Sequence, residues 1–117
     1  APIDRELLDG EHALVFERFP YLALAKTYNT DQQVPDSAGT MSAIMTGVKT
    51  RAGMIAMDDR IGVGDFVEDM QAHAVPTLLE QAEERGLSTG VVTTTSVTNA
   101  TPAACYAHVP DRGWQSG

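Results

Sequence analysis

The clearest periodic pattern of apolar and polar positions lies in residues 75–86 and predicts a helix. Apolar side chains recur there at the spacing that places them on one helical face, namely Val75, Leu78, Leu79 and Ala82. Pro76 suits the first turn of a helix, where a missing N–H loses no hydrogen bond. Gly86 suits the position at which a helix ends. We therefore expect an amphipathic helix in this part of the chain.

Two other segments carry residues that favour extended structure. Residues 91–97 are rich in β-branched side chains and predict a strand. Residues 21–28 are compatible with a buried strand or with a helical turn, and their β-favouring ends favour the strand. After the second segment, Thr101 and Pro102 predict another helix, with Thr101 as its N-cap and Pro102 at its first helical position.

A helix start is also predicted inside residues 34–50. Asp36 is a good N-cap for a helix over residues 38–45, and Gly47 is a plausible stop. Ser37 lies at this junction, where unpaired backbone N–H groups and the helix dipole favour negative charge. Ser37 is therefore a candidate nucleophile toward a phosphate group. On local pattern alone, the same residues are more typical of a simple helix cap.

The order strand, helix, strand, helix indicates an α/β protein with a parallel sheet. At 117 residues the chain suits one domain. Residues 51–72 carry no clear pattern and are expected to be a variable surface insertion. The methionines there, Met54, Met57 and Met70, are expected to fill packing gaps rather than to form a redox or metal site. Asp9 and Gly10 predict a turn.

The charge balance narrows the possible partners. The formal net charge is −8, from sixteen acidic and eight basic residues, so no basic stripe is available for nucleic acid. No apolar run reaches the length of a membrane-spanning helix, and the first residues lack the features of a signal peptide. The single cysteine, Cys105, excludes an internal disulfide. The acidic, lysine-poor composition also fits a salt-adapted protein.

Several short blocks occur in an order that is informative as a whole. They are residues 18–29, 35–38, 46–50, 90–95, 100–104, 106–108 and 112–114. From about Phe16 to Trp114 this series resembles the alkaline phosphatase family. The resemblance implies an α/β fold, part of a three-layer sandwich with a mostly parallel central sheet that is incomplete in this chain. Residues 1–117 would then form a partial alkaline-phosphatase-like domain with its variable insertion around residues 51–72.

The resemblance implies hydrolysis of phosphate monoesters through a phosphoserine intermediate. Ser37 takes the position of the nucleophile, which is also a metal ligand, and Asp36 takes the acidic, substrate-binding position before it. Arg112 matches the arginine that grips two phosphate oxygens, a task that suits a planar guanidinium fork. On local pattern alone, Arg112 would be a solvated loop residue paired with Asp111 or with nothing.

The resemblance further implies two zinc ions and one magnesium ion. Thr101 matches a position that binds magnesium through its hydroxyl, a use that competes with capping a helix. Asn99 matches a metal-site position that is usually aspartate or histidine, and an amide is a weaker, neutral ligand. Histidines 12, 73 and 108 are dispersed without metal-ligand spacing, so we expect them to be surface or packing residues.

The segments that carry most zinc ligands in the family have no counterpart in this sequence. We therefore expect an internal piece of a larger enzyme, with little or no activity as an isolated chain. The alternative is a catalytically inactive fragment or association module of the same fold. A phosphodiesterase or sulfatase-like relative is a third reading, which the residues around Ser37 and the presence of Arg112 disfavour. The resemblance also implies a periplasmic or extracellular location, and either a homodimer or association with the remainder of the enzyme.

Overall fold

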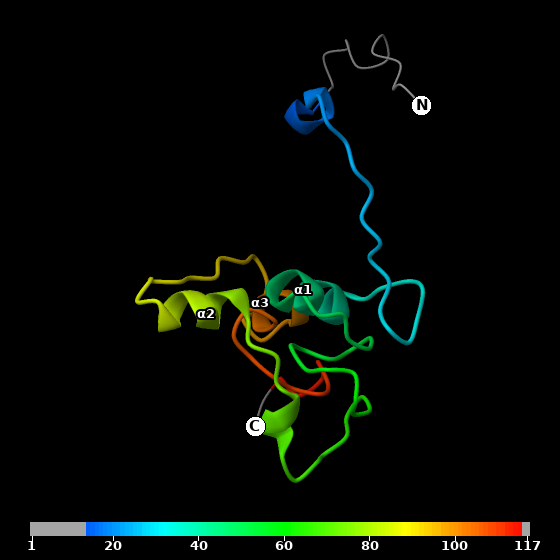
Figure 1. Ribbon diagram of the computed structural model, residues 1–117, viewed down its shortest axis with the longest axis vertical. Coiled ribbons are helices and arrows are strands. Elements are labelled where there is room, and N and C mark those ends of the chain that lie inside the picture. The colour runs from blue at the N-terminus through cyan, green and yellow to red at the C-terminus, as the bar shows by residue number, and fades with distance from the viewer. Residues whose placement is uncertain (1–13, 116–117) are drawn as a thin grey trace.

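The structure is a computed structural model, and it describes residues 14–115 (Figure 1). Its helical elements follow the chain in a fixed order: η2 (Val15–Arg18), α1 (Ser37–Thr46), η3 (Met70–His73), α2 (Leu78–Glu84) and α3 (Ala100–Ala103). In Figure 1, α1, α2 and α3 lie together in the body, while η2 sits at the far end of an extended segment. The predicted turn at Asp9 and Gly10 lies outside the described residues.

Helix α1 begins and ends where local sequence predicts. The side chain of its N-cap, Asp36, accepts a hydrogen bond from the Gly39 N–H at 2.9 Å. At the other end Gly47 adopts a left-handed conformation with φ of 76° and donates its N–H to the Ala43 carbonyl at 3.0 Å. Both ends therefore satisfy backbone groups that a helix leaves without partners. The predicted helix is confirmed.

Helix α2 is also confirmed, but it begins later than predicted. Its N-cap is Thr77, which forms a capping box with Glu80, so Pro76 precedes the helix instead of lying in its first turn. Thr77 is fully buried, and its hydroxyl donates to the Cys105 carbonyl at 2.8 Å, which ties α2 to the end of α3. Gly86, with φ of 77°, follows the helix as predicted.

Helix α3 corrects the predicted capping assignment. Its N-cap is Asn99, whose backbone is extended. The Asn99 side chain makes no capping hydrogen bond. Thr101 therefore lies inside the first turn, and its hydroxyl does not cap the helix. Pro102 is tolerated there because the N–H groups of a first turn have no partner within the helix.

The predicted strands at residues 21–28 and 91–97 are wrong for the structure. Within residues 14–115 the only β pairings are two isolated bridges, Ile55 with Val109 and Met57 with Ala74. Leu24 and Val92 are 96% and 101% exposed, so neither of these side chains is covered by a neighbour. A strand needs a neighbouring strand that pairs with its N–H and C=O groups, and within residues 14–115 no segment pairs in this way with either of these two. The three-layer sandwich is therefore not confirmed here.

The core consists of two small clusters. The first joins α1, α3 and one bridge residue, and comprises Ala38, Ile55, Ala100, Ala103 and Ala104. The second comprises Met54, Met57 and Ile61, with Met70 packed against it. The methionines thus pack as expected, but residues 51–72 do not lie wholly at the surface, because Met54 and Met57 are at most 1% exposed. Whether this segment is an insertion stays a prediction.

No helix among residues 14–115 is both long and apolar enough to cross a membrane.

The contacts between small residues in the first cluster determine where the candidate site lies. Ala38 follows Ser37 directly and is fully buried against α3, so the start of α1 is held by packing as well as by its cap. The positions of Ser37 and of the first turn of α3 are therefore set by one shared core.

Candidate functional site

The carboxylate of Asp36 is the centre of the candidate site. Its Oδ1 accepts from the Asn29 Nδ2 at 3.1 Å and from the Gly39 N–H at 2.9 Å. Its Oδ2 accepts from the Gly53 N–H at 3.1 Å and from the Arg112 Nη1 at 3.2 Å. Asp36 therefore joins the start of α1 to the segments that contain Asn29, Gly53 and Arg112.

These contacts keep Asp36 ionised. Burial raises the pKa of the Asp36 carboxyl, but hydrogen bonds from Gly39, Arg112, Asn29 and Gly53 together outweigh burial and hold its pKa below the ordinary value. The side chain is 22% exposed, so water reaches part of it. The negative charge that the lowered pKa favours restrains the guanidinium of Arg112 by charge and by hydrogen bonding.

Arg112 also reaches Ser37. Its Nη1 donates to the Ser37 Oγ at 2.8 Å, while the Arg112 side chain remains 36% exposed. The backbone of Arg112 is fixed as well, because its N–H donates to the Gly53 carbonyl at 2.7 Å. Its ion-pair partner is thus Asp36 and not the neighbouring Asp111, which instead accepts from the Gly113 N–H at 2.7 Å.

The structure therefore brings together three of the residues singled out from sequence. Asp36, Ser37 and Arg112 form one hydrogen-bonded group whose charged member faces a hydroxyl at a helix start. A guanidinium beside an exposed serine at such a start suits a dianionic phosphate, because both the charge and the helix dipole favour negative charge there.

Asn99 and Thr101 lie at the start of α3, whose residues pack against α1. Among the described residues, neither side chain hydrogen-bonds to Asp36, Ser37 or Arg112. Thr101 is exposed and Asn99 is half-buried. The Thr101 hydroxyl does not cap the helix, so the competition between capping and metal binding that was expected from sequence does not arise in the structure.

The donor chemistry separates the two metals that the family resemblance implies. Residues 14–115 contain no group of three or more histidine, cysteine or carboxylate side chains that could hold a metal ion. Zinc sites use such groups, so the described residues do not fit a zinc centre by themselves. The hydroxyl and amide oxygens of Ser37, Asn99 and Thr101 are hard donors of the type that magnesium accepts.

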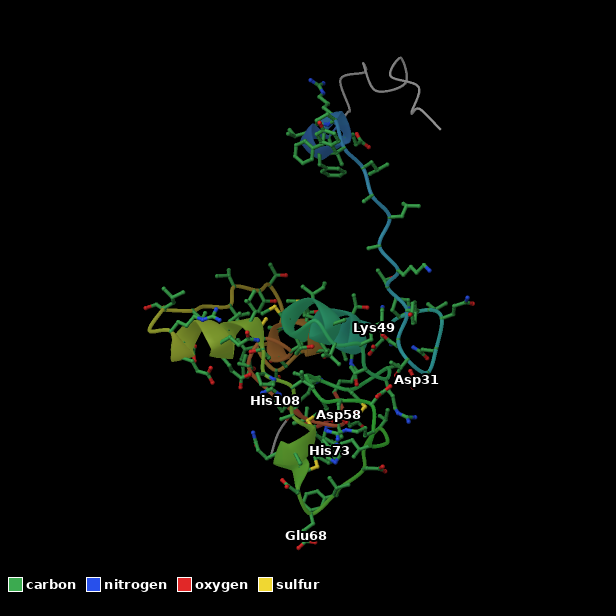
Figure 2. The ribbon with its side chains drawn as sticks, in the orientation of Figure 1. Asp31, Lys49, Asp58, Glu68, His73 and His108 are labelled. Atoms are coloured by element: carbon green, nitrogen blue, oxygen red, sulfur yellow. The ribbon has the colours of Figure 1, made fainter. Side chains whose placement is uncertain are left out.

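His73 and His108 contact carboxylate and carbonyl oxygens elsewhere in the chain, away from Asp36, Ser37 and Arg112 (Figure 2). His108 lies between the Glu80 carboxylate and the Ala56 carbonyl, at 2.8 Å from each. The His73 Nδ1 lies 3.1 Å from the Asp58 carboxylate. Both are half-buried and tie loops to the body, in agreement with the predicted packing role. His12 lies outside the described residues.

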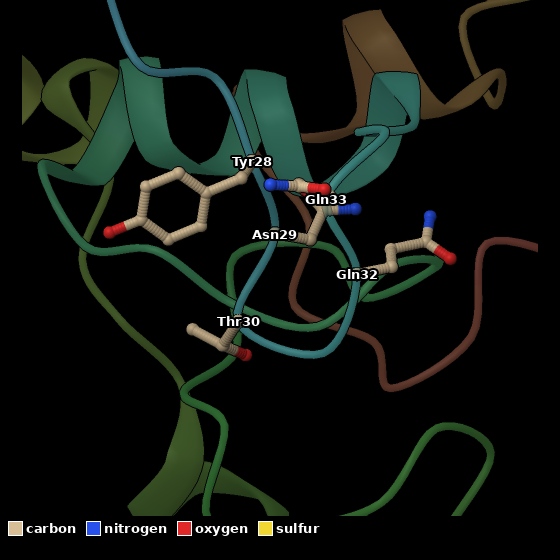
Figure 3. A pocket seen from close by; sticks show the side chains of 5 residues that line it. All are labelled: Tyr28, Asn29, Thr30, Gln32 and Gln33. Atoms are coloured by element: carbon tan, nitrogen blue, oxygen red, sulfur yellow. The ribbon is translucent and has the colours of Figure 1, made fainter.

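Sequence reasoning missed Asn29 and Gly53. No local pattern assigned a role to Asn29, which is only 3% exposed and contacts Asp36. Its place in one of the blocks that resemble the family was the only signal available. A hollow of about 400 Å³ lies beside it, lined by residues of the same loop: Tyr28, Asn29, Thr30, Gln32 and Gln33 (Figure 3).

Comparisons with known proteins identify the family of the chain. The family model described as alkaline phosphatase matches residues 4–117. The chain is 50% identical over 105 residues to alkaline phosphatase 4 of Drosophila melanogaster, covering 90% of this chain and 17% of the relative. It is 45% identical over 111 residues to the human tissue-nonspecific alkaline phosphatase isozyme, covering 91% of this chain and 20% of the relative.

Solved structures give the same result. A variant of TAB5 alkaline phosphatase with magnesium bound in its M3 site matches with a TM-score of 0.70 and 34% identity, covering 86% of this chain and 26% of that one. The cold-active alkaline phosphatase of Shewanella sp. matches with a TM-score of 0.69 and 34% identity, covering 89% and 24% of the two chains. The chain thus spans only a minor part of the length of these relatives. The resemblance found in the sequence is confirmed, and the chain belongs to the alkaline phosphatase family.

Proposed function

We propose that this chain is the nucleophile segment of a phosphomonoesterase that works through a phosphoserine intermediate, as part of a larger enzyme. The observation that carries the proposal is the hydrogen bond from Arg112 to Ser37, together with the ion pair between Arg112 and Asp36. This contact unites a nucleophile, a phosphate-binding cation and a fixed counter-charge. The family membership of the chain supports the same reaction.

In this proposal, Arg112 holds two oxygens of the substrate phosphate with parallel charge-assisted hydrogen bonds. When substrate binds, the hydrogen bond from the Arg112 Nη1 to the Ser37 hydroxyl is replaced, at least in part, by hydrogen bonds to phosphate oxygens. The bound phosphorus then lies close to Ser37, whose oxygen attacks it while the P–O bond to the alcohol breaks on the opposite side. The hydroxyl proton of Ser37 passes to solvent, and the departing alcohol oxygen takes up a proton from solvent. Water next attacks the phosphoserine, which releases inorganic phosphate and restores the hydroxyl.

Asp36 has a restraining role in this scheme. One of its oxygens binds the Arg112 Nη1, so the guanidinium keeps its orientation when no substrate is present. Preorganised charge of this kind lowers the reorganisation required in the transition state. The preference for monoesters follows, because a diester leaves fewer charged oxygens for the guanidinium fork to grip.

Metal ions, when bound, would activate the serine hydroxyl and neutralise the leaving oxygen. Asn99, Thr101 and Ser37 would supply oxygen ligands to metal, with magnesium the best match for the first two. The two zinc ions would depend on side chains other than the described ones, because the described residues offer no zinc-ligand cluster. We therefore assign no step to zinc within this chain.

A catalytically inactive fragment or an association module is the second candidate function. The exposure of large apolar side chains favours it, with Tyr21, Leu24 and Val92 each at least 90% exposed. Apolar side chains left this exposed would gain from being covered by another surface. They are compatible with a homodimer or with association with the remainder of an enzyme. A periplasmic or extracellular location is proposed from family membership alone.

The two candidates separate in a hydrolysis assay of a phosphate monoester with zinc and magnesium. The full-length enzyme that carries this segment and its Ser37→Ala variant are compared with the isolated 117-residue chain. The proposal expects turnover by the full-length enzyme, loss of turnover in the variant, and none by the isolated chain. Full turnover in the variant contradicts the role of Ser37. Zinc-dependent turnover by the isolated chain contradicts the dependence on a larger enzyme, and no turnover by any of the three favours the second candidate.

A further inference from the structure

Asn29 is a polar residue buried at the hub of the candidate site. Only 3% of it is exposed, and its Nδ2 donates to the Asp36 Oδ1 at 3.1 Å. The other oxygen of the same carboxylate binds Arg112. Asn29 and Arg112 are therefore connected through one rigid, planar group, so that a rotation of the carboxylate would affect both contacts.

The chain around Asn29 is held from both sides. The Asn29 N–H donates to the Gln32 carbonyl at 3.0 Å, and the Thr30 N–H donates to the Thr50 carbonyl at 3.0 Å. Lys49 fixes the preceding residue, because its Nζ donates to the Tyr28 carbonyl at 2.8 Å and lies 4.1 Å from the centre of the Tyr28 ring. The amide of Asn29 thus reaches Asp36 from a fixed backbone.

The neighbouring helix leaves space for this amide. A Cβ atom on Gly39 would lie 2.5 Å from the Asn29 Oδ1 and 2.9 Å from its Cγ, distances that side chains do not reach without a shift. Gly39 also donates its N–H to the same Asp36 oxygen as Asn29. The first turn of α1 therefore accommodates the Asn29 side chain only because residue 39 lacks a side chain.

We propose that Asn29 is a positioning residue that orients the phosphate-binding Arg112 through Asp36. This inference rests on the proposed function and names a further residue for it. An amide suits the role because it donates to the carboxylate without adding charge. An aspartate of the same shape would place a second carboxylate beside Asp36, which repels it and removes the donor.

The test uses the full-length enzyme and measures KM and kcat for a phosphate monoester, and the inhibition constant of inorganic phosphate. Losing a hydrogen bond to a charged group corresponds to about a ten-fold effect. Asn29→Ala is expected to raise KM and the inhibition constant by about ten-fold, with a smaller change in kcat, and Asn29→Asp is expected to raise them further. Gln33→Ala, on the same loop and exposed, is the matched control and should leave all three unchanged.

A double-mutant cycle separates positioning from general loss of structure. If Asn29 acts through Asp36 on Arg112, then Asn29→Ala adds little to the inhibition constant of phosphate once Arg112 is alanine. Gly39→Ala leaves Asn29 chemically intact but displaces its amide, so it should weaken phosphate binding in the same direction. This variant also supplies the test if Asn29→Ala does not fold.

The inference is overturned if Asn29→Ala and Gly39→Ala both leave KM and the inhibition constant within about two-fold of the unmodified enzyme, a change well below one lost hydrogen bond. It is also overturned if the effect of Asn29→Ala is undiminished when Arg112 is alanine. A failure of the proposed function has a different signature, which is full hydrolysis by the Ser37→Ala variant. The two outcomes are therefore distinguishable in one set of assays.

Discussion

The Nη1 of Arg112 donates to the Oγ of Ser37 at 2.8 Å across a separation of 75 residues. The same nitrogen lies 3.2 Å from the Asp36 carboxylate, so the contact with Ser37 is made by a side chain that is already paired. This geometry matters because a paired arginine keeps its direction, whereas a free one samples many rotamers. The arrangement leaves the exposed part of the guanidinium available for an anion.

Replacing Arg112 tests whether the guanidinium fork is needed. Lysine retains the charge but loses the planar pair of donors, so we expect Arg112→Lys to lower kcat/KM of the full-length enzyme by about ten-fold or more. Arg112→Ala should lower it further, because the charge is also lost. Steady-state kinetics with a phosphate monoester measure both. A lysine variant with unchanged kcat/KM would exclude bidentate binding of phosphate by Arg112.

Gly47 allows a test of the helix end that is independent of function. Its φ is 76°, and a Cβ atom there would meet nothing within 4 Å, so only backbone strain opposes a side chain. Gly47→Ala should therefore lower the free energy of unfolding by about 1 kcal/mol. Gly90→Ala is the matched control, because Gly90 has equal space and no positive φ. Urea unfolding compares the two, and equal stabilities would contradict the assignment of Gly47 as the helix cap.

The lowered pKa of Asp58 makes the free energy of unfolding depend on pH in the acid range. The hydrogen bond from Arg60 is the largest influence on the Asp58 carboxyl; together with the bond from His73 it outweighs burial and lowers the pKa from 3.8 to about 2. A carboxyl whose folded pKa is lowered stabilises the fold fully above pH 3.8, and this contribution is lost as the pH falls toward about 2.

We therefore expect Asp58→Asn to lower stability at neutral pH and to flatten the fall in stability between pH 3.8 and about 2. Asp59→Asn, which removes the same charge next to it, is the control. Because Arg60 is largely exposed, added salt should reduce the effect. Unfolding curves across this pH range provide the measurement, and an unchanged acid dependence in Asp58→Asn would show that the pair is irrelevant to stability.

Cys105 should be unreactive in the folded protein. It is 5% exposed, and burial raises the pKa of its thiol, so little thiolate forms at neutral pH. We expect iodoacetamide to modify Cys105 slowly in the native protein and rapidly after addition of denaturant. Mass spectrometry over time measures this difference. Equal rates in both conditions would mean that the packing of α3 against Thr77 is absent in solution.

Local sequence predicted the parts of the fold that local interactions determine. Asp36 and Gly47 bound α1 because a cap and a left-handed glycine act within a few residues. At α3, by contrast, the prediction of Thr101 as the N-cap was wrong, because Asn99 is an equally suitable type of capping residue and Pro102 fits more than one position of a first turn. The choice depends on packing of Ala100 against α1, which is a tertiary contact.

The strands failed for a different reason. Residues 21–28 and 91–97 have the composition of strands, but a strand exists only when another segment pairs with it, and pairing is not encoded in either segment alone. The candidate site also contains contacts that local sequence patterns could not predict. The grouping of Ser37 with Arg112 came from resemblance to a family, since no local rule joins residues so far apart. Burial of Asn29 arises from the fold and was not visible in the sequence.

Trapping the phosphoryl group tests the central claim most directly. The full-length enzyme is incubated with labelled inorganic phosphate, quenched in acid, digested, and mapped by mass spectrometry. Our account predicts covalent phosphate on the peptide that contains Ser37, and no label in the Ser37→Ala variant. Label on any other residue, or full hydrolysis of a phosphate monoester by Ser37→Ala, would contradict it.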